Sequence, residues 1–343
     1  MEILDIPLPA SHPAGHGLLR IRGSIVDGRV EAAEVVTGLM HRGAEKLFES
    51  RDYRQILSLA NRHDWLSSFD GELSAARVME QALGITVPAR AAALRIVVSE
   101  TCRLSHHLYW LGETVAALGG DASDLRAARA AITEALDVLT GARMHLMIVR
   151  IGGMSLDADP RWPADLPLAD CVDAVTGCLD PIASRLAGVA VLTREQAQAY
   201  ATSGVVARAS GWVRDLREYP PPWRIVSHDA GDALARMDCL VQEVLVSCEF
   251  LRSVSLPEGD ISTRLPRTIR LPEGEFYGAS ETGSGINGWW IVSDADVVPA
   301  RMKMRTASFN NAAAFGACLP GTRLEDLPTA LMSFLLVAGD MDK

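Results

Sequence analysis

Alternating apolar and polar residues mark the N-terminal part of the chain. Two such runs, residues 18–26 (L-L-R-I-R-G-S-I-V) and 29–36 (R-V-E-A-A-E-V-V), flank Asp27-Gly28. An Asp-Gly pair between two alternating runs is a strong signal for a β-hairpin. We therefore predict a hairpin here, followed by a helical turn, a loop and a further helix over residues 37–69.

The middle of the chain has the apolar spacing of helices. Between residues 71 and 83 the apolar positions share one helix face, and Gly84 supplies a C-terminal stop. Pro88 opens the longest helical stretch, which we place at residues 89–118. The region as a whole is typical of a bundle of long antiparallel helices. Further helices are predicted over residues 121–139, 165–187, 194–201 and 229–254, with another element over 141–153.

The pattern changes again after the bundle. Residues 257–309 are rich in Gly, Pro, Ser and Thr and carry short apolar runs, which predict a small mixed sheet. Residues 325–338 predict an apolar final helix. The fold class is therefore α+β, with an N-terminal β-hairpin, a central long-helix bundle and a C-terminal sheet. We treat 1–343 as one domain with a hairpin and loop region (1–70), a helix bundle (71–256) and a sheet with terminal helix (257–343).

Composition narrows the class of protein. The chain has 343 residues, of which 48% are hydrophobic, and its net charge is −10. This charge disfavours a nucleic-acid binder, which normally presents a basic face. No apolar run approaches the roughly 18 to 20 residues of a membrane-spanning helix. The first residues lack the pattern of a signal peptide, so we expect a cytoplasmic protein whose membrane association comes through partners.

Cysteine spacing predicts no metal site. The chain contains six cysteines, and no pair has the spacing of a zinc, iron–sulfur or redox motif. Buried thiols in a reducing compartment are the simpler interpretation. The string G-x-G-x-x-G occurs once, at residues 283–288 (G-S-G-I-N-G). The apolar run W-W-I-V-S that follows predicts a strand rather than the helix of a dinucleotide site, so we expect no such site in this chain.

Several motifs occur in the order of one known family. They include H-P-A-G-H-G-L-L-R at 12–20, T-G-L-M-H-R-G-A-E-K at 37–46 and Q-A-L-G-I-T-V-P-A-R-A at 81–91. Near the end come R-M-K-M-R-T-A-S-F at 301–309 and G-D-M-D-K at 339–343. Over nearly its whole length the chain resembles the quinone-facing large subunit of respiratory complex I, which we call the D-type subunit.

That family is related to the large subunit of nickel–iron hydrogenases, so the resemblance implies a hydrogenase large-subunit-like fold. Hydrogenases hold nickel with two C-x-x-C pairs. The matching segments here, residues 61–68 and 334–342, contain no cysteine, which excludes a nickel site.

The resemblance implies a function in a complex. In the family, the D-type subunit and a cluster-bearing B-type subunit form the cavity in which quinone is reduced. We therefore expect an NADH-quinone oxidoreductase subunit, active only in its complex, on the cytoplasmic side of the cell membrane. Its partners would be B-type, C-type and membrane-arm subunits, and no nucleic acid. Quinone is the substrate, the iron–sulfur cluster belongs to the partner, and this chain alone binds no cofactor.

The first motif supplies two candidate quinone-binding histidines. His16 matches the residue that binds the headgroup, and His12 lies in the same loop. A neutral imidazole can hydrogen-bond a quinone carbonyl, and a protonated one can release a proton during reduction. The alternative is that both rings cap the loop by bonding backbone groups.

Two expected polar groups are replaced. Trp65 stands where the family has a tyrosine whose O–H reaches the other quinone carbonyl. An indole has one N–H donor and cannot supply a proton, so the ring either stacks on the quinone or fills the site. Ala117 stands where the family has an aspartate that orients the headgroup histidine, which alanine cannot do.

Two residues are expected to face the partner's cluster. Arg42 matches an arginine whose fixed positive charge raises the cluster's potential. His145 matches a histidine near the same cluster, where protonation can follow reduction. The alternatives are a surface or interface salt bridge of Arg42, for instance with Glu45 or Glu49, and a satisfied core histidine at position 145.

A further motif has also lost charged groups. Glu281 and Gly285 keep part of the family's E-x-x-R-G-E turn, but Ser284 and Ile286 replace its arginine and second glutamate. We expect the shape of this turn to survive without its charge network. These differences leave a second function open, that of a non-catalytic structural paralogue of the D-type subunit with a degenerate quinone site.

Inside the bundle, the E-T-C-R-L-S-H-H-L segment matches the family's E-x-x-R-x-x-x-H-L. We expect Glu100 to pair with Arg103. No third ligand is evident for a metal at His106 and His107, so both are interpreted as structural.

Overall fold

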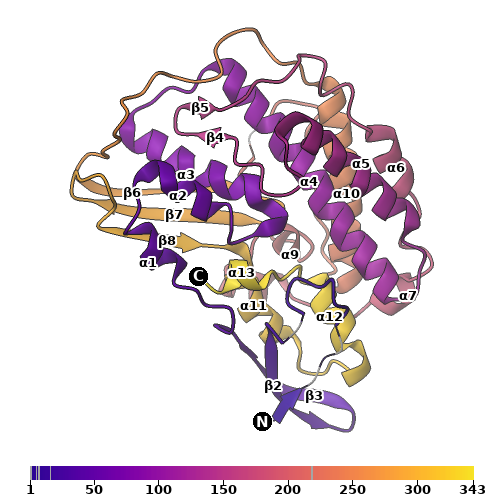
Figure 1. The fold of residues 1–343 in the computed structure, drawn as a ribbon. Helices are drawn as coiled ribbons and strands as arrows, with labels where there is room; N and C mark the ends of the chain where they lie inside the picture. The colour runs from indigo at the N-terminus through magenta and orange to yellow at the C-terminus, as the bar shows by residue number, and fades with distance from the viewer. Residues whose placement is uncertain (1, 5, 7, 16, 218) are drawn as a thin grey trace.

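Long helices, a C-terminal sheet and an N-terminal hairpin occupy three parts of the molecule (Figure 1). The structure is a computed structural model, and it describes residues 2–4, 6, 8–15, 17–217 and 219–343. The mixture of an N-terminal antiparallel hairpin, a helix bundle and a C-terminal sheet confirms the predicted α+β fold class.

The N-terminal sheet contains the predicted hairpin and one additional strand. The antiparallel strands are β1 (Glu2–Leu4), β2 (Arg20–Val26) and β3 (Arg29–Val36), with β2 in the centre. Asp27 and Gly28 both have positive φ, at 49° and 73°. This is the backbone that a two-residue hairpin turn requires, and it explains the Asp-Gly pair.

The bundle is built around one long buried helix. α4 (Ala89–Ala117) packs against α5 (Ser123–Thr140) and against α10 (Ala233–Ser253). α3 (Ser68–Leu83) precedes it and ends at Gly84, whose φ of 64° confirms the predicted stop. Because α4 is covered on several sides, its charged residues Arg95, Glu100 and Arg103 are buried and need partners.

One bundle prediction is wrong. Residues 165–187 form two short helices, α6 (Leu168–Val175) and α7 (Ala183–Leu186), because Gly177 turns the chain with a φ of 69°. The further element predicted over residues 141–153 is a short antiparallel ladder near the end of that range. Its strands are β4 (Val149–Arg150) and β5 (Gly153–Met154), and α8 (Arg194–Ala199) and α9 (Gly204–Arg208) follow later.

The C-terminal sheet is antiparallel in both pairings, which corrects the predicted mixed sheet. Its order is β6 (Gly274–Glu281), β7 (Ile286–Ser293) and β8 (Arg301–Arg305). α3 packs against β6 and β7, and the Trp289 indole donates to Ser74 Oγ at 2.9 Å.

The remaining helices are short. The predicted final helix is interrupted at Leu335, which has a φ of 57°, so α12 (Leu327–Ser333) is separated from α13 (Ala338–Met341). α11 (Ala307–Cys318) was not predicted. In the part of the chain that the structure describes, no helix combines the length and the apolar character needed to cross a membrane. Four further short helices complete the described part of the fold. They are α1 (Ala44–Phe48), α2 (Tyr53–Ala60) and the 3-10 helices η1 (Trp65–Ser67) and η2 (Leu324–Asp326).

Candidate functional site

The loop before β2 is fixed to α4 by His12. The ring is buried, and its Nδ1 accepts the backbone N–H of Ala14 at 2.9 Å. Its edge contacts the Trp110 ring, with centroids 5.4 Å apart. Burial lowers the pKa of His12 to about 4, so the ring is neutral at physiological pH. His12 therefore makes the loop-capping contact, while His16 lies outside the described residues.

Trp65 lies at the same end of α4 as this loop. It is half-buried in η1 and meets the ring of Tyr109 edge-on, with centroids 5.4 Å apart. The Tyr109 hydroxyl donates to the carbonyl of Ser11 in the loop. One helical residue thus joins two segments more than fifty positions apart. The cavity beside Trp65 has a volume of about 20 Å³, roughly the room for one water molecule.

The loop that contains His12 has a carboxylate beside it, but at Glu113 rather than at position 117, where the family has an aspartate. Ala117 is exposed at the end of α4. Glu113, on the same face one turn earlier, accepts a hydrogen bond from the hydroxyl of Ser11. Sequence reasoning missed both Tyr109 and Glu113. Their i, i+4 spacing places them on one helix face, but nothing in the sequence indicates that the loop would dock there.

Asp64 holds the turn that carries Trp65. Its Oδ1 accepts the backbone N–H groups of Leu66 and Ser67 at 3.0 and 3.3 Å, which caps η1. Its Oδ2 accepts the hydroxyl of Ser284 at 2.6 Å. Burial, and then the charge of Asp340, raises the pKa of Asp64 to about 6.

Backbone hydrogen bonding closes the turn after β6. The backbone N–H of Thr282 donates to Gly285 O at 2.8 Å, and Gly285 has a φ of 130° that favours glycine. A side chain at Gly283 would meet the His106 ring at 2.8 Å. The turn therefore lies directly against α4 and presents Ser284 to the His106 ring.

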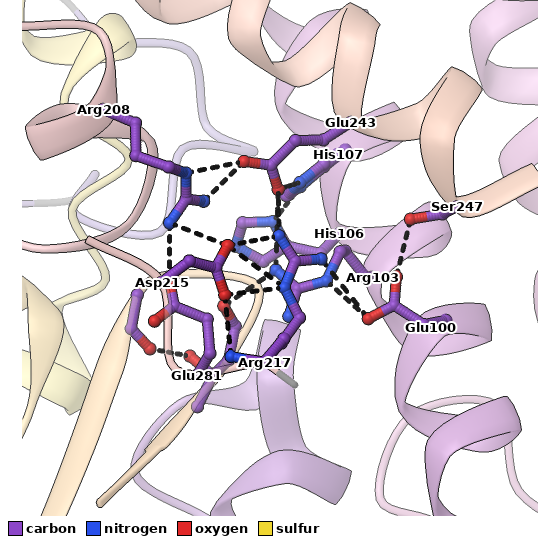
Figure 2. A network of polar contacts seen from close by, with 12 residues as sticks. Glu100, Arg103, His106, His107, Arg208, Asp215, Arg217, Glu243, Ser247 and Glu281 are labelled. Atoms are coloured by element: carbon purple, nitrogen blue, oxygen red, sulfur yellow. Dashed lines mark hydrogen bonds and ion pairs between the residues drawn. The ribbon is translucent and has the colours of Figure 1, made fainter. Parts of the chain in front are cut away.

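An ionic cluster lies under this turn (Figure 2). Arg208 Nη1 binds Glu281 Oε1 at 2.7 Å, and its Nε binds Glu243 Oε1 at 3.0 Å. The predicted pair of Glu100 and Arg103 is confirmed at 3.1 Å. We call these residues the ionic cluster: Glu100, Arg103, Arg208, Asp215, Arg217, Glu243 and Glu281.

Of the charged residues in the family's E-x-x-R-G-E turn, Glu281 is retained, and it belongs to the ionic cluster. Burial raises the pKa of Glu281, and the neighbouring Asp215 acts in the same direction, whereas Arg208 opposes both. With three arginines for four carboxylates, the cluster has no spare positive charge.

Arg42 and His145 both contact the segment between α2 and η1. Arg42 is exposed and its Nη2 approaches Arg62 O at 3.5 Å. The predicted alternative, a salt bridge to Glu45 or Glu49, is wrong, because both carboxylates bind Arg301.

His145 is half-exposed, and its Nδ1 lies 2.6 Å from Asn61 Oδ1. Burial lowers its pKa, and the nearby Arg62 lowers it further. A half-exposed ring is not the fully enclosed core histidine of the alternative interpretation. The side chains of the described residues include no group of three or more His, Cys, Asp or Glu that could hold a metal ion.

Comparison with known proteins places this arrangement in one family. The family model described as "Respiratory-chain NADH dehydrogenase, 49 Kd subunit" matches residues 124–269 and 262–343. The chain is 40% identical to the second D-type subunit of the NADH-quinone oxidoreductase of Streptomyces griseus, over 97% of this chain and 90% of that protein.

More distant relatives match the full length. The D-type NADH-quinone oxidoreductase subunit of Geobacillus thermodenitrificans is 33% identical over 99% of both chains. Its counterpart in Carboxydothermus hydrogenoformans is 32% identical over 99% of this chain and 98% of that protein. The chain therefore belongs to the 49-kDa, or D-type, subunit family of NADH-quinone oxidoreductases, and is one subunit of a multi-subunit oxidoreductase.

Proposed function

We propose that this chain forms one wall of the quinone site in a membrane-associated NADH-quinone oxidoreductase. One observation carries the proposal. Tyr109 bonds the loop that contains His12 and His16 and also packs on Trp65, so the segments assigned to the quinone by the family motifs meet at one end of α4. The partner is a cluster-bearing B-type subunit, and the complex is placed on the cytoplasmic side of the membrane.

The site residues have distinct tasks in this proposal. Reduction of a quinone to a quinol needs two electrons and two protons. The electrons come from the partner's iron–sulfur cluster, which Arg42 and His145 are assigned to face. Their contacts with Arg62 and Asn61 hold both side chains against the same segment. His16 binds the headgroup, and the Trp65 ring lies along the quinone without giving a proton. The neutral, buried ring of His12 keeps the loop in place.

Restoring the replaced groups should increase the rate. In the assembled complex, Trp65→Tyr combined with Ala117→Asp is expected to raise NADH-dependent quinone reduction about tenfold, because a proton donor and a carboxylate return to the headgroup. His16→Ala is expected to lower it by about 10²-fold. Trp162→Tyr, at another half-buried tryptophan, is the matched control and should leave the rate unchanged.

A second function is favoured by the small cavity beside Trp65. A non-catalytic paralogue would keep the fold and the partner surface while Trp65 fills the quinone site. In that case neither the double variant nor His16→Ala changes quinone reduction or inhibitor binding, and quinone is reduced only when a second D-type subunit is present. This result would refute the quinone-wall proposal.

A further inference from the structure

A continuous line of hydrogen bonds connects Asp64 to the ionic cluster. Ser284 Oγ lies 2.6 Å from Asp64 Oδ2 and 3.1 Å from His106 Nε2. His106 Nδ1 lies 2.9 Å from His107 Nδ1, and His107 Nε2 lies 3.0 Å from Glu243 Oε2. All five side chains are at most 3% exposed. We call these residues the proton chain, and Figure 2 shows how the two histidines reach the cluster.

The proton chain needs one more hydrogen than its groups carry in their ordinary states. Four contacts at hydrogen-bond distance need four hydrogens. A serine hydroxyl supplies one and each neutral imidazole supplies one, while ionised carboxylates supply none. With only these three, one contact would bring two lone pairs together inside the protein, which is costly. The geometry therefore requires one excess proton between Asp64 and Glu243.

The excess proton does not reside on Glu243. Burial raises the pKa of this carboxyl, but the charges of Arg208 and Arg217 outweigh burial and hold its pKa well below the usual range. Glu243 is therefore ionised and accepts the Nε2–H of His107. Burial lowers the pKa of His107, although Glu243 opposes this, so the His107 ring carries one proton only. That proton is on Nε2, and the Nδ1 of His107 must accept from His106 Nδ1. The excess proton is left to His106 and Asp64.

The surroundings favour the Asp64 end of the proton chain. Burial, followed by the charges of His107 and Arg103, disfavours a second proton on His106. Burial and the neighbouring Asp340 favour a proton on Asp64. The other charged or titratable groups that act on the proton chain are His63, Arg129, Arg217 and Arg208.

We propose that the proton chain stores one excess proton and passes it between His106 and Asp64, supplying the acid group beside Trp65 that the indole lacks. In the transfer, His106 Nε2 gives its proton to Ser284 Oγ while the Ser284 hydroxyl gives its own to Asp64 Oδ2. Only O–H and N–H bonds form and break, so one proton moves and no oxidant or reductant is needed. The delivery of this proton to a quinone rests on the proposed function above.

Nuclear magnetic resonance of the full chain without quinone can detect the excess proton shared by His106 and Asp64. With ¹⁵N-labelled histidine and ¹³C-carboxyl-labelled aspartate, the Asp64 carboxyl and the His106 ring should titrate in one shared transition, because one proton links them. A through-hydrogen-bond coupling between the two Nδ1 atoms is also expected. Asp64→Asn and His106→Gln assign the signals by their loss. Independent titration of Asp64 and His106, or two unprotonated Nδ1 atoms at neutral pH, would overturn the proposal.

Ser284→Ala should cut the link between the two groups, and Ser247→Ala is its matched control. Ser247 also donates to a buried carboxylate, Glu100 at 2.7 Å, but lies off the proton chain. The shared transition is expected to split in Ser284→Ala and to persist in Ser247→Ala. If it persists in both variants, or is lost in both, the relay through Ser284 is wrong.

Delivery of the proton to quinone is tested by measuring quinone reduction in the assembled complex. Ser284→Ala should lower quinone reduction by about 10²-fold and change its pH profile, whereas Ser247→Ala should do neither. If the shared transition exists but Ser284→Ala reduces quinone as fast as the unaltered complex, delivery to the site is refuted. A wild-type complex that reduces no quinone would contradict the proposed function and leave the titration result intact.

Discussion

Replacing Arg208 by Met is expected to lower the free energy of unfolding by about 3–5 kcal/mol at neutral pH. Arg208 is fully buried and binds Glu243, Glu281 and Asp215. Met fills the space of the aliphatic stem but brings no charge, so buried carboxylates lose their shared cation. Urea unfolding of the purified chain, followed by circular dichroism, measures the loss.

The loss of unfolding free energy in Arg208→Met should depend on pH, because the carboxyls that Arg208 contacts can bind protons. Without Arg208, the folded-state pKa values of these carboxyls rise above their unfolded values. The folded state then binds protons more tightly, so the deficit is largest at neutral pH and shrinks as the pH falls. Arg224→Met is the control, because Arg224 and Glu249 form an exposed pair expected to contribute less than about 1 kcal/mol. A deficit of that small size in Arg208→Met would contradict this account of the ionic cluster.

Asp70→Asn is expected to remove a pH-dependent loss of stability. Asp70 lies on α3, where its Oδ1 accepts the Ser99 hydroxyl at 2.5 Å and its buried Oδ2 has no partner among the described groups. Burial raises its pKa from 3.8 to about 6. The folded state therefore binds the proton more tightly, and ionisation costs stability as the pH rises through this interval. The full difference corresponds to about 3 kcal/mol above pH 6.

The measurement is the difference in unfolding free energy between wild type and Asp70→Asn across pH 4 to 8, where wild type should lose stability relative to the variant as the pH rises. Asp64 and Glu72 have raised pKa values for the same reason and contribute in both proteins, so they cancel in the difference. Asp124→Asn, at an exposed position, should follow the wild-type profile. If the difference in unfolding free energy between the two proteins does not change with pH, the pKa of Asp70 is not raised by burial and the prediction is wrong.

The sequence predicts a helix correctly where residues within or next to the helix determine where it begins and ends. The predicted helix over residues 89–118 is observed at Ala89–Ala117, because Pro88 favours its start and apolar residues continue for several turns. Sequence reasoning failed where one residue breaks a long apolar pattern. Gly177 divides the predicted helix over 165–187, and Leu335 interrupts the terminal one. Neither interruption can be distinguished from a tolerated residue without the tertiary contacts that hold it.

The candidate site was less accessible from the sequence. Family motifs indicated Trp65 and the histidine loop, but the residue that joins them, Tyr109, belongs to no motif that was recognised. The proton chain draws on separate segments, so no spacing along the sequence reveals it. His106 and His107 were interpreted as structural because no metal ligand was evident. Their contacts with Ser284 and Glu243 give them a chemical environment that only the fold creates.

Photolabelling can show whether the histidine loop and Trp65 together contact quinone, as we propose. The assembled complex is irradiated with a quinone analogue that carries a photoreactive group on its headgroup, and labelled peptides are identified by mass spectrometry. We expect label in residues 8–19 and at Trp65, and we expect excess unlabelled quinone to suppress it. Labelling confined to other subunits, with these segments of the chain unmodified, would contradict it.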